Sequence, residues 1–170
     1  MNSLNVAFIG LGVMGYPMAG YLKRVGYQTK VFNRTTEKAI QWVKDYQGEL
    51  ASSPKEAAES ADIVFICVGN DDDVRSVVYG ESGVLASLKP GAILVDHTTT
   101  SAQLSIELAA ACANHNVECM DETVSGGQAG AENGTLTVMC GSNADTFTTV
   151  QPVLNAYAKQ ATLLGGQGQG

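Results

Sequence analysis

The chain has 170 residues, of which 45% are hydrophobic and 16% charged, and its formal net charge is -7 at pH 7. This size and composition predict one globular domain with a core of its own. The acidic balance argues against binding to nucleic acid, and the longest apolar run, 63–68, is too short to cross a bilayer. No signal-peptide pattern opens the sequence, so we expect a cytoplasmic protein without membrane contacts.

Short apolar runs alternate with amphipathic segments along the whole chain. Strands are predicted at 5–9, 29–33, 49–51, 62–68, 92–96, 117–121, 136–140 and 162–164. Helices are predicted at 13–25, 37–45, from Pro54 onward, at 71–79, 102–114 and 144–157, the last one split by Pro152. The alternation predicts an α/β fold of the Rossmann-like, doubly wound kind, with a mostly parallel sheet and helices on both faces.

A glycine-rich turn follows the first predicted strand directly and opens the first predicted helix. It reads Gly10-Leu11-Gly12-Val13-Met14-Gly15. In such a turn the first glycine permits a tight bend, the second lets the main chain approach a pyrophosphate, and the third lets helix and strand pack closely. The free N–H groups of the helix N-terminus favour an anion there. The pattern predicts a dinucleotide site.

The end of the second predicted strand bears on which dinucleotide is bound. NAD sites usually place an acid there to accept from the ribose 2′-hydroxyl, whereas this chain has Asn33 followed by Arg34 and Thr35. A guanidinium can grip a 2′-phosphate through two parallel N–H bonds. We therefore expect NADP rather than NAD, unless Arg34 is only a solvated surface charge.

The loops after later strands supply further candidates. Three acids, 71–73, follow the fourth strand, but they do not alternate as in a calcium loop and are stabilised at a helix start, so no metal is expected. Ser125-Gly126-Gly127 offers successive main-chain N–H groups that suit a carboxylate. A hydrolase triad of Ser125 with His97 and Asp96 is disfavoured because the chain has no G-x-S-x-G elbow.

Several of these motifs, in this order, resemble the β-hydroxyacid dehydrogenases, which include 3-hydroxyisobutyrate dehydrogenase and semialdehyde reductases. The segments that carry the resemblance are 10–19, 33–35, 96–100, 124–130 and 134–139. The resemblance implies that Thr99 lies near the nicotinamide ribose, that Val68 and Gly69 line the cofactor cleft, and that 125–127 binds the carboxylate of a small hydroxyacid or semialdehyde. The Asn-Arg-Thr variant is similar to the branch of the family that uses NADP.

Together these arguments give two sets of site residues. The expected cofactor-binding residues are Gly10, Leu11, Gly12, Val13, Met14, Gly15, Asn33, Arg34, Thr35, Val68, Gly69, Asp73 and Thr99. The expected substrate-binding residues are Thr99, Ser125, Gly126 and Gly127.

One departure from the family pattern concerns the catalytic group. The family continues with a glycine-rich connection, a catalytic lysine on a long helix, and an all-helical second domain. Here 1–164 matches the NADP-binding domain and 165–170 the start of that connection. The lysine would fall about four residues beyond Gly170, so no catalytic residue is expected in this chain and the isolated domain should turn over poorly.

Two other interpretations remain open at this point. The chain also resembles the cofactor domain of 6-phosphogluconate dehydrogenase, which would need a further cationic cluster for a sugar phosphate. It could instead be a non-catalytic nucleotide-binding module, because a fold does not fix a function. The longer protein is expected to form a homo-oligomer.

Overall fold

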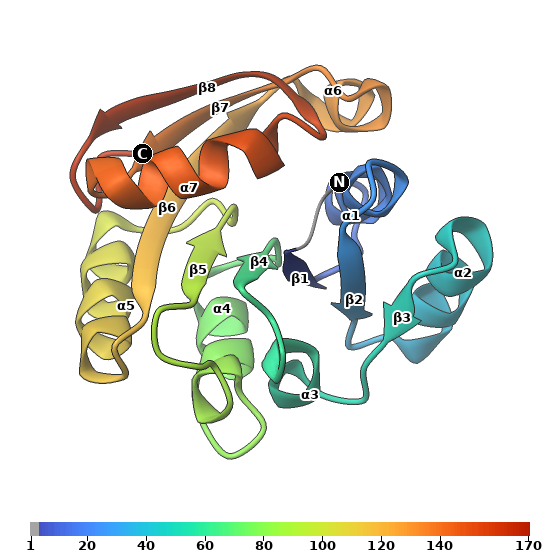
Figure 1. The fold of residues 1–170 in the computed structure, drawn as a ribbon, viewed down its shortest axis with the longest axis horizontal. Helices are drawn as coiled ribbons and strands as arrows, with labels where there is room; N and C mark the ends of the chain where they lie inside the picture. The colour runs from blue at the N-terminus through green and yellow to red at the C-terminus, as the bar shows by residue number, and fades with distance from the viewer. Residues whose placement is uncertain (1–3) are drawn as a thin grey trace.

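The computed structural model describes residues 4–170 as one mixed sheet with helices on both faces (Figure 1). The strands are β1 (Asn5–Ile9), β2 (Gln28–Phe32), β3 (Glu49–Leu50), β4 (Ile63–Ile66), β5 (Ile93–Asp96), β6 (Glu118–Ser125), β7 (Leu136–Gly141) and β8 (Ala158–Gly165). The helices are α1 (Gly15–Arg24), α2 (Thr36–Tyr46), α3 (Pro54–Ala58), α4 (Asp71–Val78), the 3-10 turn η1 (Val84–Ala86), α5 (Ala102–Asn114), α6 (Gly127–Asn133) and α7 (Ala144–Leu154).

The strand order is β3-β2-β1-β4-β5-β6-β7-β8, and every neighbouring pair is parallel except β6 with β7. The chain first moves outward from β1 to β2 and β3, and then crosses back to place β4 on the other side of β1. In sheets of this kind a ligand binds where the direction of winding reverses, outside the carboxyl ends of the strands. The doubly wound prediction is confirmed, and it places the binding crevice between β1 and β4.

Two separate cores cover the two faces of the sheet. Because side chains alternate along a strand, Phe8 and Phe65 point to one face while Ile9 and Val64 point to the other. The first face packs against α1, α2 and α7, and the second against α3, α4 and α5. Every residue of β4 is buried, as expected for a central strand with helices on both sides. No helix among residues 4–170 is long and apolar enough to span a bilayer.

Three predictions for the second half of the chain are wrong. The sixth strand continues to Ser125 instead of stopping at Asp121, because β7 pairs antiparallel with it beyond the end of β5. The segment after it forms the helix α6, a helix absent from our predicted elements. The last strand covers Ala158–Gly165 rather than 162–164, since it pairs along the whole of β7.

Pro152 does not divide the last helix into two pieces. It lies inside α7 only two residues before the helix ends at Leu154, and the chain then turns into β8. Proline removes the N–H that would bond to the carbonyl four residues earlier. The Asn155 amide still donates to the Gln151 carbonyl oxygen at 3.2 Å, so the helix continues past Pro152 to Leu154 without a break.

Candidate dinucleotide site

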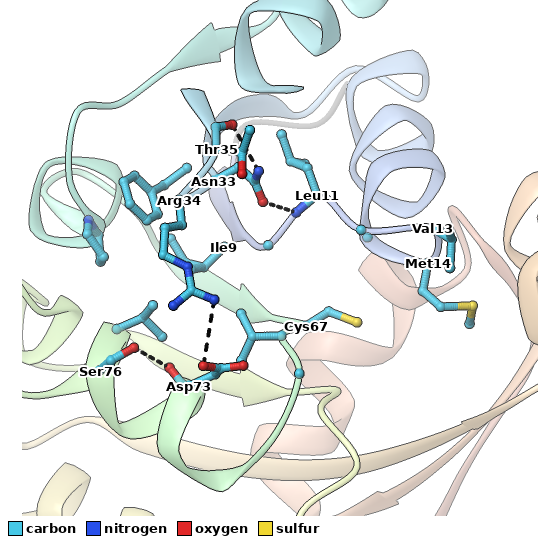
Figure 2. Close-up of a pocket in the computed structure, with 18 residues that line it drawn as sticks. Ile9, Leu11, Val13, Met14, Asn33, Arg34, Thr35, Cys67, Asp73 and Ser76 are labelled. Carbon is cyan, nitrogen blue, oxygen red and sulfur yellow. Dashed lines mark hydrogen bonds and ion pairs between the residues drawn. The ribbon is translucent and has the colours of Figure 1, made fainter. Parts of the chain in front are cut away.

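A cleft of about 610 Å³ lies at the carboxyl ends of β1, β2 and β4 (Figure 2). Ile9 pairs with Phe32 of β2 and with Ile66 of β4, so the three strands end at the same level and their following loops meet. The lining includes Gly10, Leu11, Gly12, Val13, Met14, Gly15, Asn33, Arg34, Thr35, Val68, Gly69 and Asp73. All the expected cofactor-binding residues except Thr99 therefore come together in one cleft.

Each of the three glycines in the loop after β1 is a glycine for a different structural reason. Gly10 has φ +104°, and a Cβ there would collide with the carbonyl oxygen of Cys67. A Cβ at Gly15 would collide with the carbonyl oxygen of Gly10, so this glycine lets α1 approach the loop. A Cβ at Gly12 would meet nothing within 4 Å and would project into open space. Gly10 and Gly15 are needed for the fold, while Gly12 leaves room for a ligand.

The N-terminus of α1 supplies donors to this open space. Its N-cap residue Met14 makes no side-chain capping hydrogen bond. The Tyr16 amide donates to the Gly12 carbonyl oxygen at 3.0 Å and Pro17 has no N–H, so the donors at this end are the amides of residues 13–15. Such amides, with the partial positive charge of the helix terminus, favour phosphate groups. Room above Gly12 and uncapped amides beside it fit the pyrophosphate of a dinucleotide.

Asn33 shapes the loop from within the protein. Its Oδ1 accepts a hydrogen bond from the Leu11 amide at 2.9 Å, and its Nδ2 donates to the Thr35 carbonyl oxygen at 3.0 Å. The side chain thus ties the glycine loop after β1 to the loop after β2. Its place at the cleft is as expected, but its amide group is already engaged.

Arg34 extends from the end of β2 into the cleft, and 84% of its side chain is exposed. Its Nη2 lies 3.8 Å from Oδ1 of Asp73 on α4 (Figure 2). A guanidinium in this position can bind a phosphate group in the cleft.

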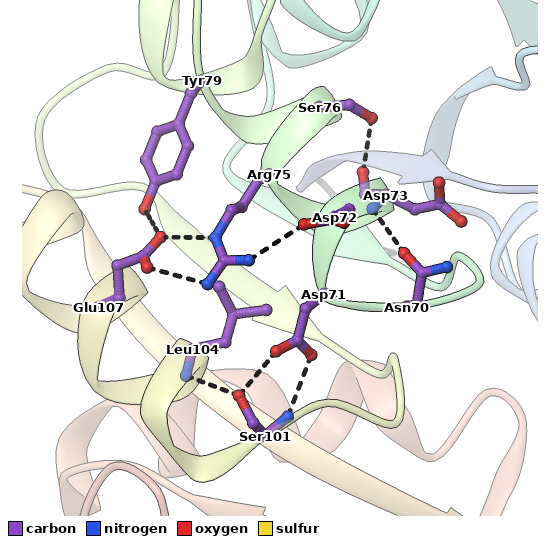
Figure 3. A network of polar contacts seen from close by, with 10 residues as sticks. All are labelled: Asn70, Asp71, Asp72, Asp73, Arg75, Ser76, Tyr79, Ser101, Leu104 and Glu107. Atoms are coloured by element: carbon purple, nitrogen blue, oxygen red, sulfur yellow. Dashed lines mark hydrogen bonds and ion pairs between the residues drawn. The ribbon is translucent and has the colours of Figure 1, made fainter.

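The three consecutive acids at the start of α4 have three different partners, two of which are drawn in Figure 3 and the third, Arg34, in Figure 2. Asp71 accepts from the hydroxyl and amide of Ser101, which lowers the pKa of its carboxyl. Asp72 pairs with Arg75 at 3.2 Å, and Asp73 faces Arg34. Within residues 4–170 no three acids, histidines or cysteines gather as metal ligands would.

Thr99 and the 125–127 segment do not line this cleft. Thr99 is exposed in the loop after β5, while Ser125 ends β6 opposite Thr137 of β7. Gly126, at φ +127°, caps α6 and Gly127 begins it. The Ser-Gly-Gly segment is a junction between a strand and a helix, exposed at its surface.

Both ring nitrogens of His97 face polar groups inside the protein. Its Nδ1 lies 2.6 Å from Oε2 of Glu122, with both side chains fully buried, and its Nε2 lies 2.6 Å from the hydroxyl oxygen of Tyr157. The ring also stacks on Phe65 at 5.7 Å between centroids. Neither nitrogen is available to activate Ser125, which argues against the hydrolase triad.

Six lining residues were missing from our sequence interpretation. They are Ile9, Phe32, Pro54, Cys67, Ser76 and Val77. Ile9, Phe32 and Cys67 lie directly before the predicted loops, so strand ends were the signal that could have found them. Burial, and secondarily the charge of Asp96, raises the pKa of the Cys67 thiol to about 12, so this group stays protonated and is not a nucleophile.

The strand order and the cleft define this chain as a dinucleotide-binding domain of the doubly wound class. Comparison with known families agrees: residues 5–166 match the NAD binding domain of 6-phosphogluconate dehydrogenase. The chain belongs to this family of oxidoreductase cofactor domains.

The curated relatives of the chain include hydroxyacid dehydrogenases. It is 57% identical over 165 residues to an "Uncharacterized oxidoreductase" of Shewanella frigidimarina, covering 97% of this chain and 57% of the relative. It is 38% identical to the "Probable 3-hydroxyisobutyrate dehydrogenase-like 2, mitochondrial" of Arabidopsis thaliana, covering 99% of this chain and 56% of the relative. The chain thus spans a little over half the length of these relatives.

Solved structures show the same fold. The 3-hydroxyisobutyrate dehydrogenase of Mycobacterium tuberculosis, solved with L-serine, superposes with a TM-score of 0.92 at 30% identity, over 98% of this chain and 56% of that one. Psf3, solved with NADP+ and 2-OPP, superposes with a TM-score of 0.91 at 27% identity, over 96% and 58% of the two chains. The resemblance to the 3-hydroxyisobutyrate dehydrogenases is therefore confirmed for their N-terminal domain.

Proposed function

We propose that this domain binds NADP(H), with NAD(H) as the weaker ligand. The single observation that carries the proposal is the meeting, in one cleft, of the main-chain amides of residues 13–15 at the start of α1 and the Arg34 guanidinium. The amides suit the pyrophosphate and the guanidinium suits a 2′-phosphate. The NADP+ in Psf3 supports the same choice of ligand.

In the longer protein, the domain would present the nicotinamide for reversible hydride transfer to or from a small β-hydroxyacid or semialdehyde. Support comes from the printed names of the dehydrogenase relatives. Thr99 and 125–127 would orient the substrate, and a lysine beyond Gly170 would exchange the proton on the substrate oxygen. A positioned acid or base contributes about 10²- to 10⁴-fold to such a step, so residues 1–170 alone should bind the dinucleotide with little turnover.

Titration of the chain with NADPH and NADH, followed by ligand fluorescence, tests the cofactor proposal. Arg34→Ala should weaken NADPH binding about tenfold to hundredfold because a charge-assisted pair with the 2′-phosphate is lost. NADH binding should change little. Lys38→Ala, which removes an exposed positive charge from α2 outside the cleft, is the matched control and should leave both affinities unchanged. A preference for NADH in both the wild type and Arg34→Ala would contradict the proposal.

A further inference from the structure

In the part of the chain that the structure describes, the cleft contains one carboxylate, that of Asp73, and it comes from α4 rather than from the end of β2. The position after β2, where an acid would favour NAD over NADP, is occupied by Asn33. Asp73 reaches the same cleft from α4 and faces Arg34 across it (Figure 2). A 2′-phosphate in the cleft would therefore meet both the positive charge of Arg34 and the negative charge of Asp73.

Asp73 is anchored through its main chain at the start of α4. Its amide donates to Oδ1 of Asn70 at 2.9 Å, and its carbonyl oxygen accepts from the Ser76 hydroxyl at 2.7 Å. Its Oδ2 lies where a side chain on Gly69 would begin. Only 28% of the Asp73 side chain is exposed, against 84% of Arg34. A positioned acid thus faces a guanidinium that is largely free to turn toward a ligand.

We propose that Asp73 is a specificity-determining residue that limits the preference of this domain for the 2′-phosphorylated dinucleotide. This inference rests on the proposed NADP(H) function. A 2′-phosphate must compete with Asp73 for Arg34, and it also meets a like charge near it. NADH carries no such phosphate, and its ribose hydroxyls can donate to a carboxylate. Asp73 therefore reduces the difference between the affinity for NADPH and the affinity for NADH.

The test is the ratio of the NADH to the NADPH dissociation constant in Asp73→Asn, measured by fluorescence titration at low ionic strength. The ratio should rise about twofold to fivefold, the range that exposed ion pairs support. Adenosine 2′,5′-bisphosphate and 5′-AMP, which differ only in the 2′-phosphate, should show the same change by calorimetry. Asp73→Ser is measured in parallel in case the asparagine variant folds poorly.

Asp72→Asn is the matched control. It removes the same charge one residue earlier on α4, where the carboxylate is 94% exposed and pairs with Arg75 outside the cleft. In an Arg34→Ala background the effect of Asp73→Asn should shrink, because the competition for the guanidinium no longer exists.

Each outcome decides between the two proposals. If the wild type binds neither dinucleotide, the proposed function fails and the inference with it. If the wild type binds NADPH but Asp73→Asn leaves the ratio unchanged, lowers it, or alters it as much as Asp72→Asn does, the inference is wrong and the proposed function stands. A rise specific to Asp73 supports the inference.

Discussion

Of the glycines in the loop after β1, Gly10 is required by the fold, whereas Gly12 leaves space for a ligand. Gly10 has a positive φ and no room for a Cβ, since the Cys67 carbonyl lies against it. Gly12 has neither constraint: a side chain there would enter the open cleft. Substitution at the first position should unfold the protein more easily, and substitution at the second should obstruct the ligand.

Gly12→Val should therefore weaken dinucleotide binding while leaving stability nearly unchanged. A valine would occupy the space that a pyrophosphate needs, and crowding of this kind costs roughly tenfold to hundredfold in affinity. NADPH titration and urea unfolding measure the two quantities separately. Gly166→Val is the control, because Gly166 also has open space around it but lies outside the cleft. Equal NADPH affinity in Gly12→Val and wild type would show that no ligand approaches this glycine.

At the residue scale, the sequence alone predicted which loops meet but not how their side chains pair. The residues after β1, β2 and β4 could be placed together because the carboxyl ends of neighbouring parallel strands share one edge of a sheet. The bond from the Leu11 amide to Asn33, and the Arg34–Asp73 pair, join segments 22 residues or more apart. Such pairings depend on the three-dimensional arrangement of loops, which local motifs do not contain.

At the scale of elements, the parallel part of the sheet was predictable and the edge beyond β6 was not. An apolar run such as Ile63–Ile66 identifies a strand that is covered on both faces. The strand β6 instead carries buried Asp121 and Glu122, and its later part is paired by β7, an antiparallel partner that follows it. A polar sequence and an unforeseen partner together explain why it looked like a loop from Asp121 onward.

Asp121 links β6 to the glycine-rich segment after β8. Its two carboxylate oxygens accept from the amides of Gly168 at 2.6 Å and Gly170 at 2.8 Å. Gly141 lies so close to Gly170 that a Cβ on it would crowd the Gly170 nitrogen. The carboxylate therefore fixes the direction in which the chain leaves the sheet.

Asp121→Asn should loosen this segment without affecting the dinucleotide cleft. Hydrogen bonds to a charged acceptor are stronger than neutral ones, and the asparagine side chain offers one accepting oxygen in place of two. Amide hydrogen exchange at Gly168 and Gly170, followed by NMR, should accelerate about tenfold. Asp145→Asn, which alters an exposed carboxylate on α7, serves as the comparison and should change neither rate. Unchanged exchange in Asp121→Asn would mean that other contacts hold the segment.

At the scale of the whole molecule, the carboxyl edge of the sheet combines ligand binding with buried polar groups. Asp96, His97, Asp121 and Glu122 are all buried there, where apolar residues would pack at lower cost. Asp96 accepts from the Thr98 amide at 2.9 Å, and the Thr98 hydroxyl accepts from the Val68 amide at 3.0 Å. These hydrogen bonds connect the end of β5 to the end of β4 that lines the cleft. The buried polar groups lower the stability of the domain, but they fix the shape of the cleft.

The cost of burying Asp96 should be visible as a dependence of stability on pH. Burial raises the pKa of Asp96 from 3.8 to about 6, although the Thr98 donors oppose the shift. Between these values the folded state binds more protons than the unfolded state, so the contribution of Asp96 is fully present below pH 4 and is lost as the pH rises through 6.

Asp96→Asn should remove this dependence, because its amide is neutral at every pH and its oxygen can still accept from Thr98. Relative to wild type, the variant should gain about 3 kcal/mol in free energy of unfolding between pH 4 and pH 7, the equivalent of a shift of this size. Urea unfolding at both pH values measures the difference, and Asp72→Asn, at an exposed site, should show none of it. A constant difference between Asp96→Asn and wild type would mean that the pKa of Asp96 is not raised in the folded protein.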